Sequence, residues 1–115
     1  MGDPVVFFEI TGPDGTALQS FYSEVFGWAV ESRPFPGYAY ISTDQPGVQA
    51  GGLREEPQAP PERVLYIRVP DLQAALDRVL AHGGTVLIPP TDVPGIVTFA
   101  LFKDPAGNTT GLVKA

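Results

Sequence analysis

Two charged residues lie where they could do chemistry, Glu9 and Arg68, each inside a short apolar segment of alternating pattern. A guanidinium can hold a carboxylate through two hydrogen bonds, and a glutamate in half-apolar surroundings can exchange a proton with a ligand. The pair could therefore serve as a substrate clamp or as an acid–base pair. The alternatives are an ion pair that only stabilises the fold, or an arginine that simply extends into solvent.

Aromatic side chains form the second group of candidates. Those in strand-like segments that we expect to line a ligand site are Phe7, Tyr38, Tyr40, Tyr66 and Phe99. Small-molecule pockets are mostly apolar with a few polar groups, and a tyrosine ring with its hydroxyl suits a flat organic ligand. Other aromatic residues have a simpler interpretation. Trp28 is typical of core packing, and Phe21 and Phe26 lie in a helical pattern that predicts packing between helix and sheet.

The composition excludes several other chemistries. The 115 residues include no cysteine, which removes disulfides, thiolate nucleophiles and cysteine–zinc sites. The one histidine, His82, falls at the end of a helical pattern, where a favourable interaction with the helix dipole is a simpler explanation than metal ligation. Because this is the only histidine in the sequence and it is misplaced, a Ser/His/Asp catalytic triad is excluded. The Gly51-Gly52 pair does not lie between a strand and a helix, so a phosphate-binding loop is excluded as well.

The charge balance limits the partners. Seven Lys and Arg residues against thirteen Asp and Glu residues give a formal net charge of −6. Such a chain repels phosphate backbones, so nucleic acid is not expected as a partner, and cationic ligands are favoured.

The N-terminal segment has no basic stretch, and its apolar run is too short for a signal peptide or a membrane span. We therefore expect a cytoplasmic protein that binds a small molecule and does not associate with a membrane.

An internal repeat predicts the elements that position these residues. The segments 10–14 and 67–71 share the pattern Ile-x-x-Pro-Asp at a spacing of 57 residues. After each aspartate, apolar residues recur with the spacing of an amphipathic helix. The two aspartates are typical N-cap residues, and Gly27 and Gly83 fit the left-handed conformation that ends a helix.

Segments of period two follow each helical pattern and predict strands. They are 28–33, 38–43 and 48–53 in the first copy and 85–88, 96–102 and 109–113 in the second, with a turn at 89–92. The uniformly apolar faces, such as Leu65, Ile67 and Val69, should lie under the helices. The polar, proline-rich segment 54–62 predicts a linker. We expect one domain, 1–115, in which this linker joins a βαβββ module at 4–53 to a second one at 63–115.

Three motifs add a family resemblance to this pattern. They are Phe21-Tyr22 followed by Phe26-Gly27-Trp28, the Val69-x-Asp71-Leu72 start of the second helix, and Asp104-Pro105-x-Gly107-Asn108 before the last strand. With these motifs the chain, over nearly its whole length, resembles the vicinal oxygen chelate superfamily, which includes glyoxalase I, bleomycin-resistance proteins and extradiol dioxygenases. The resemblance implies an α+β fold in which tandem βαβββ modules form a cupped, eight-stranded mixed sheet. It also implies a ligand on the concave face and pairing into homodimers.

Metal-using members of this superfamily hold a divalent ion with His, Gln or Glu on the first, fourth, fifth and last strands. The resemblance places three of these ligand positions at Phe7, Val64 and Gly111, none of which carries a donor. Glu9 is the one carboxylate expected on the concave face, and one carboxylate does not make a chelate site. We therefore predict no metal and no cofactor.

The resemblance and the missing ligand set together predict a protein similar to the bleomycin-resistance branch. It would bind a small aromatic or amphipathic molecule in a concave pocket without a metal, through Phe7, Glu9, Tyr38, Tyr40, Tyr66, Arg68 and Phe99. One alternative is a lyase or isomerase of the same superfamily, with Glu9 as general base and Arg68 or Tyr66 polarising a carbonyl. Another is a structural or regulatory dimer without a ligand. The sequence leaves open whether the protein is an enzyme.

Overall fold

The computed structural model describes residues 2–32, 35–46 and 50–114, and its elements repeat the order βαβββ twice. The first module contains β1 (Val5–Gly12), α1 (Gly15–Phe26), β2 (Ala29–Glu31), β3 (Tyr38–Ser42) and β4 (Ala50–Glu55). The second contains β5 (Arg63–Val69), α2 (Leu72–Ala81), β6 (Thr85–Val93), β7 (Val97–Lys103) and β8 (Thr109–Lys114). The repeat inferred from the spacing of two Ile-x-x-Pro-Asp segments is confirmed.

The chain forms two compact units, an N-terminal unit of residues 7–63 and a C-terminal unit of residues 1–6 and 64–115. The strand order is β2-β3-β4-β1 in the first and β5-β8-β7-β6 in the second. In each unit one strand pair is parallel, β1 with β4 and β5 with β8, and the other described pairs are antiparallel. This is the expected α+β class with an eight-stranded mixed sheet.

Both helices begin and end as the sequence predicts. The carboxylate of Asp14 accepts a hydrogen bond from the backbone N–H of Ala17 at 3.0 Å, and that of Asp71 accepts one from Ala74 at 3.0 Å. These bonds satisfy amides that have no partner inside the helix and place negative charge at its positive end. Gly27, with φ of 71°, ends α1 in the left-handed conformation.

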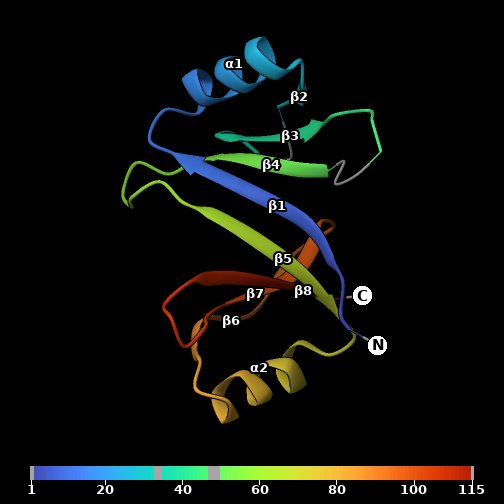
Figure 1. The fold of residues 1–115 in the computed structure, drawn as a ribbon, viewed down its shortest axis with the longest axis vertical. Coiled ribbons are helices and arrows are strands. Elements are labelled where there is room, and N and C mark those ends of the chain that lie inside the picture. The colour runs from blue at the N-terminus through green and yellow to red at the C-terminus, as the bar shows by residue number, and fades with distance from the viewer. Residues whose placement is uncertain (1, 33–34, 47–49, 115) are drawn as a thin grey trace. The chain divides into compact units, whose positions relative to one another are not determined.

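Each helix covers one face of its own sheet (Figure 1). Under α1, Ile10, Ile41 and Leu53 form a buried cluster, and Tyr22 of the helix stacks on Trp28 with ring centroids 4.9 Å apart. Under α2, the buried residues are Val69, Leu72, Leu76, Ala100 and Leu112. Neither helix in the described part of the chain is long and apolar enough to cross a membrane.

Three expectations about packing are wrong. Phe21 and Phe26 do not pack between helix and sheet but are 54% and 60% exposed. The stripe of α1 that faces the sheet contains Leu18 and Tyr22, while Phe21 meets the ring of Tyr22 edge to face and Phe26 stacks on it. Leu65, expected under a helix with Ile67 and Val69, is 53% exposed.

The predicted turn at 89–92 is also wrong, because these residues continue β6 to Val93. β6 is the last strand in the order of its unit, where a proline without an N–H is tolerated, and its register shifts on both sides of Ile88. The chain instead turns at Gly95, with φ of 74°. β4 extends two residues into the segment predicted as linker, and Val48 and Gln49 of the predicted strand 48–53 lie outside the described residues.

The turn before β8 is organised by one carboxylate. Oδ1 of Asp104 accepts hydrogen bonds from the backbone N–H groups of Ala106 and Asn108, each at 2.9 Å, and Oδ2 accepts one from the side-chain amide of Asn108 at 2.9 Å. These donors, above all the side chain of Asn108, lower the pKa of Asp104 below its usual value of 3.8.

We therefore expect Asp104 to make the stability of the protein depend on pH. Because its pKa is lower in the folded state, the carboxylate stabilises the fold above the unfolded pKa, and this stabilisation is lost as the pH falls through the folded pKa. Urea unfolding of Asp104→Asn should show lower stability than the unmodified protein near neutral pH and a smaller loss between about pH 5 and pH 3. Asp77→Asn, on the surface of α2, is the control, and equal pH profiles for the unmodified protein and Asp104→Asn would contradict the prediction.

Candidate functional site

In the N-terminal unit, the sheet face that α1 leaves uncovered carries a row of polar and aromatic residues. Glu31 pairs with Tyr40, Tyr40 with Gly52, and Gly52 with Glu9. Because directly paired residues point to the same face, these four lie side by side across all four strands. Alternation along the strands adds Phe7 and Tyr38 to this face.

Glu9 is the buried centre of this face, with 6% of its surface exposed. The Tyr38 hydroxyl donates a hydrogen bond to Oε2 of Glu9 at 2.7 Å, and Nε of Arg54 donates one to Oε1 at 3.1 Å. Nη1 of Arg54 also binds Oε2 of Glu56 at 3.0 Å. A buried carboxylate is tolerated only when charge and hydrogen bonds compensate it, and Tyr38 and Arg54 supply both.

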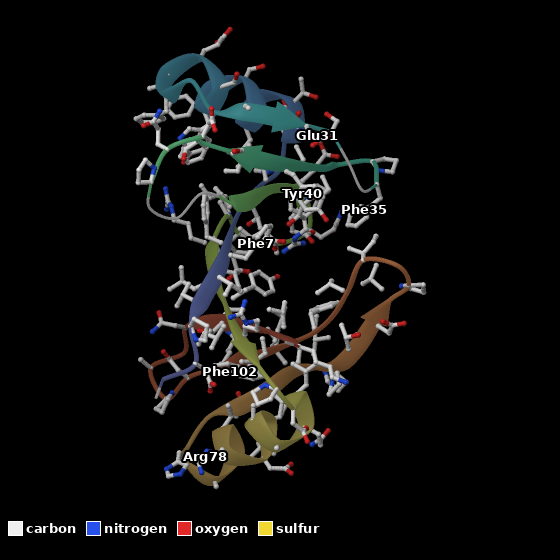
Figure 2. The ribbon with its side chains drawn as sticks, turned by 90° about the vertical axis from the view of Figure 1, so that its right-hand side faces the viewer. Phe7, Glu31, Phe35, Tyr40, Arg78 and Phe102 are labelled. Atoms are coloured by element: carbon white, nitrogen blue, oxygen red, sulfur yellow. The ribbon has the colours of Figure 1, made fainter. Side chains whose placement is uncertain are left out.

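Aromatic rings extend from Tyr38, which donates a hydrogen bond to this carboxylate. Phe7 meets Tyr40 edge to face at 6.3 Å, Tyr38 meets Tyr40 in the same way at 5.7 Å, and Phe35 lies 5.3 Å from Tyr38. Figure 2 shows Phe7, Tyr40 and Phe35 close to one another in the N-terminal unit. The result is an aromatic surface with an anionic centre, which suits an amphipathic ligand.

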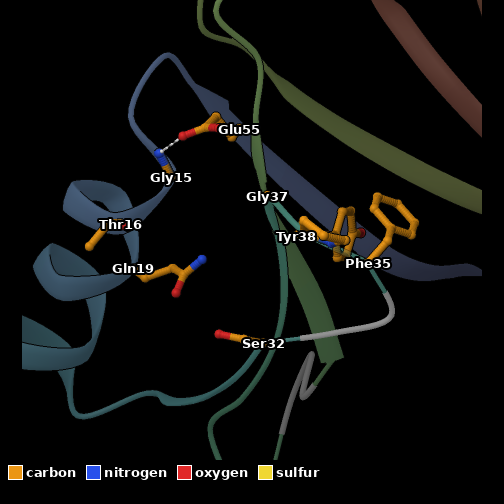
Figure 3. A pocket seen from close by; sticks show the side chains of 9 residues that line it. Gly15, Thr16, Gln19, Ser32, Phe35, Gly37, Tyr38 and Glu55 are labelled. Atoms are coloured by element: carbon orange, nitrogen blue, oxygen red, sulfur yellow. Dashed lines mark hydrogen bonds between the residues drawn. The ribbon is translucent and has the colours of Figure 1, made fainter.

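A cavity of about 490 Å³ lies beside this surface, between the first turns of α1, the segment before β3 and the end of β4 (Figure 3). Its lining includes Thr16, Gln19, Ser32, Phe35, Tyr38 and Glu55. Oε1 of Glu55 accepts a hydrogen bond from the backbone N–H of Gly15 at 3.0 Å. Tyr38 thus borders the cavity and also holds Glu9.

The remaining sequence candidates share one face in the C-terminal unit. Tyr66 pairs with Gly111, Arg68 with Val113, and Val113 with Phe99, so these residues lie opposite the face under α2. Tyr66 is buried at 8% exposure, Phe99 is half-buried, and Arg68 is exposed. Phe7, Glu9, Tyr38 and Tyr40 are therefore brought together in one unit, and Tyr66, Arg68 and Phe99 in the other.

Arg54 and Phe35 are site residues that the sequence interpretation missed. Arg54 fell in the segment predicted as linker, and Phe35 in a Pro-Phe-Pro-Gly turn. The alternation of β4 was the available signal for Arg54, because Gly52 and Arg54 share the face of Glu9. His82, by contrast, ends α2 as predicted, where its N–H donates to the carbonyl of Arg78 at 3.1 Å.

The residues present do not fit the divalent metal that the family resemblance implies. Phe7, Val64 and Gly111 carry no donor, and within residues 2–32, 35–46 and 50–114 no three His, Cys, Asp or Glu side chains come together. The position of Gly111 has no room for a ligand, because a Cβ added there would overlap the ring of Tyr66. In the other unit, a Cβ on Gly52 would overlap the hydroxyl of Tyr38.

Comparisons with known proteins show that this chain is similar to members of one protein family. Residues 5–112 match the model of the Glyoxalase/Bleomycin resistance protein/Dioxygenase superfamily. "Putative glyoxylase CFP32" of Mycobacterium bovis is 30% identical over 109 residues, covering 89% of this chain and 42% of that protein. "Anthracycline biosynthesis protein DnrV" of Streptomyces peucetius is 30% identical over 118 residues, covering 88% and 43%. The chain therefore spans less than half the length of either relative.

Solved structures show the same fold. A glyoxalase/bleomycin resistance protein/dioxygenase superfamily member from Vibrio splendidus 12B01 has a TM-score of 0.67 at 23% identity, covering 99% of this chain and all of that one. At this level of identity the likeness concerns the fold, and it confirms the architecture of tandem βαβββ modules.

The contact between Tyr66 and Gly111 gives a first prediction. Gly111→Ala places a methyl group into the tyrosine ring, and overpacking of this kind costs about 1–3 kcal/mol of unfolding free energy. In urea unfolding, Gly111→Ala/Tyr66→Ala should be less destabilised than the sum of the single variants. Gly12→Ala is the matched control, because its Cβ would lie 3.6 Å from Leu18, an ordinary contact. If the losses of the two single variants simply add in the double variant, the contact between Tyr66 and position 111 is contradicted.

The pairing of Arg54 with Glu9 gives a second prediction. Arg54→Met removes a positive partner from a buried carboxylate, so we expect a loss of about 1–3 kcal/mol in unfolding free energy. The double variant Glu9→Gln/Arg54→Met should regain part of that loss, because the side chain at position 9 is then uncharged and needs no positive partner. Glu56→Gln is the control and should cost less than about 1 kcal/mol, since its bond to Arg54 is more exposed. A larger loss in the double variant than in Arg54→Met would refute this account.

Proposed function

The chain belongs to the Glyoxalase/Bleomycin resistance protein/Dioxygenase superfamily, and we propose that within it the protein binds a small aromatic or amphipathic molecule without using a metal ion. The observation that carries this proposal is the surface of Phe7, Tyr38 and Tyr40 around the buried carboxylate of Glu9. Rings in edge-to-face contact leave faces and edges for a further ring, and the Tyr40 hydroxyl adds a polar contact.

The polar centre of this surface supports binding of a ligand with one polar end. Glu9, Tyr38 and Arg54 hold one another through bonds of 2.7 and 3.1 Å, so their positions are fixed before any ligand arrives. A preorganised site loses less side-chain freedom on binding than a mobile one. The relative from Streptomyces peucetius is named as an anthracycline biosynthesis protein, which agrees with an aromatic ligand.

The chemistry of the donor residues supports a protein that binds its ligand without a metal ion. The positions at which the resemblance expects ligands are Phe7, Val64 and Gly111, and the ring of Tyr66 fills the space above Gly111. The carboxylate oxygens of Glu9 already accept hydrogen bonds from Tyr38 and Arg54. A hard cation would have to displace these donors and would find too few oxygen or nitrogen ligands in return.

An enzyme is the second candidate, and the position of Glu9 favours it. Glu9 is a carboxylate that lies among the rings of Phe7, Tyr38 and Tyr40, so it is the group that could take a proton from a ligand bound there. If the protein is a lyase or isomerase, Glu9→Gln should abolish turnover and retain binding. A protein that only binds its ligand has no turnover to lose.

Binding can be tested with 2-naphthol and its saturated analogue 2-decalol, by thermal shift and fluorescence titration in the presence of a chelator. We expect 2-naphthol to raise the melting temperature more than 2-decalol does. Phe7→Leu and Tyr40→Leu should weaken 2-naphthol binding by about 3- to 10-fold, as expected for the loss of one aromatic contact. Phe21→Leu, on the exposed side of α1, is the matched control and should bind normally.

Two results would contradict the proposal. One is equal affinity for the aromatic probe and its saturated analogue. The other is binding that requires Mn²⁺, Ni²⁺ or Zn²⁺ and is reversed by the chelator.

A further inference from the structure

The cavity beside α1 differs in chemistry from the aromatic surface, and we propose that it binds a hydroxylated saturated ring, such as that of a sugar or an amino sugar. Its polar side chains come from three segments: Thr16 and Gln19 from α1, Ser32 from the residue that follows β2, and Glu55 from β4 (Figure 3). The volume of about 490 Å³ is within the usual range for small-molecule sites. The cavity and the aromatic surface share Tyr38 and Phe35, but none of these four polar residues belongs to the aromatic surface, so the inference is argued from different side chains.

The hydrogen-bonding groups of the cavity remain available to a ligand. Within the described part of the chain, the side chains of Thr16, Gln19 and Ser32 make no hydrogen bond or ion pair with the protein, and Oε2 of Glu55 has no such partner either. Two hydroxyls and an amide both donate and accept, and the carboxylate accepts. A ligand with several hydroxyl groups matches this mixture, because each hydroxyl is also both donor and acceptor.

Glu55 is held in place by the backbone groups of two glycines. Its N–H donates to the carbonyl of Gly37 at 2.7 Å, and its Oε1 accepts from the N–H of Gly15 at 3.0 Å. A Cβ on Gly15 would come within 3.1 Å of the Cβ of Glu55, and Gly37 has φ of 82°. Both glycines therefore allow the carboxylate to approach, with its second oxygen left for a ligand.

The aromatic wall fits a saturated ring. Phe35 is 46% exposed and leans on Tyr38 with ring centroids 5.3 Å apart, so its position is supported on one side. The C–H groups on one face of a pyranose can pack on such a ring, and the hydroxyls at its edge then reach the polar groups. A flat aromatic ligand in this cavity would instead leave those polar groups desolvated and unpaired.

The charge of the described part of the lining favours a cationic group over an anion. Glu55 is the one charged residue of the described lining, and the protein carries a net charge of −6. At the start of α1, Glu55 and Asp14 already accept hydrogen bonds from the N–H groups of Gly15 and Ala17, so these two amides are not available to an anion. An amino group on the ring would gain a charge-assisted hydrogen bond to Glu55, and a phosphate would be repelled.

The test is an NMR titration of the unmodified protein with three probes, methyl β-D-glucopyranoside, glucosamine and glucose 6-phosphate. We expect shift changes centred on Thr16, Gln19, Phe35 and Glu55, with the highest affinity for glucosamine and the lowest for the phosphate. Gln19→Ala should weaken binding of the glucoside by about 3- to 10-fold, as expected for one hydrogen bond. Gln73→Ala, on the exposed face of α2, is the matched control and should have no effect.

Two further variants separate the contributions of charge and ring. Glu55→Gln should remove the preference for glucosamine over the glucoside, and Phe35→Ala should weaken both probes alike. The inference is overturned if the sugars cause no shift changes at the cavity, if the phosphate binds as well as glucosamine, or if Gln73→Ala has the same effect as Gln19→Ala. Loss of 2-naphthol binding in a Phe7 or Tyr40 variant leaves these outcomes unaffected, so failure of the two proposals can be distinguished.

Discussion

The negative charge of Glu9 within the sheet of the N-terminal unit is the constraint on which the surrounding arrangement depends. A carboxylate with 6% of its surface exposed must be compensated locally, and the compensation comes from Tyr38 on β3 and Arg54 on β4. To reach Glu9, the tyrosine crosses over β4 at a position where only glycine leaves room. One buried charge thus determines the residue types on three neighbouring strands.

The C-terminal unit uses the same glycine position differently. Gly111 of β8 is paired with Tyr66 as Gly52 of β4 is paired with Glu9, and in both units a tyrosine covers the glycine. The covering ring comes from β3 in one case and from β5 in the other. The repeated backbone is therefore preserved while the side chains on its open face have diverged, so only the N-terminal unit places a buried carboxylate there.

Much of the fold follows from the sequence because the determining signals are local. The spacing of two Ile-x-x-Pro-Asp segments, the N-cap aspartates and the glycine after α1 predict two βαβββ modules, and alternation along β1 and β3 puts Phe7, Glu9, Tyr38 and Tyr40 on one face. The predictions that are wrong concern features that depend on packing between residues far apart in the sequence. Exposure of Phe21 and Phe26 follows from which stripe of α1 meets the sheet, and the extent of β6 follows from its place at the end of the strand order, where its prolines are tolerated. Arg54 was missed because a proline-rich composition concealed the last residues of a strand.

The covering of Gly111 by Tyr66 also limits how this lineage can change. A glutamate or histidine introduced at Gly111 would collide with the tyrosine, and removal of the tyrosine alone would open a void in a buried part of the sheet. We expect each single change to lower the stability, whereas the two changes together avoid the collision. A donor side chain at position 111 therefore requires a change at Tyr66 as well, so no single substitution is expected to create a ligand position there.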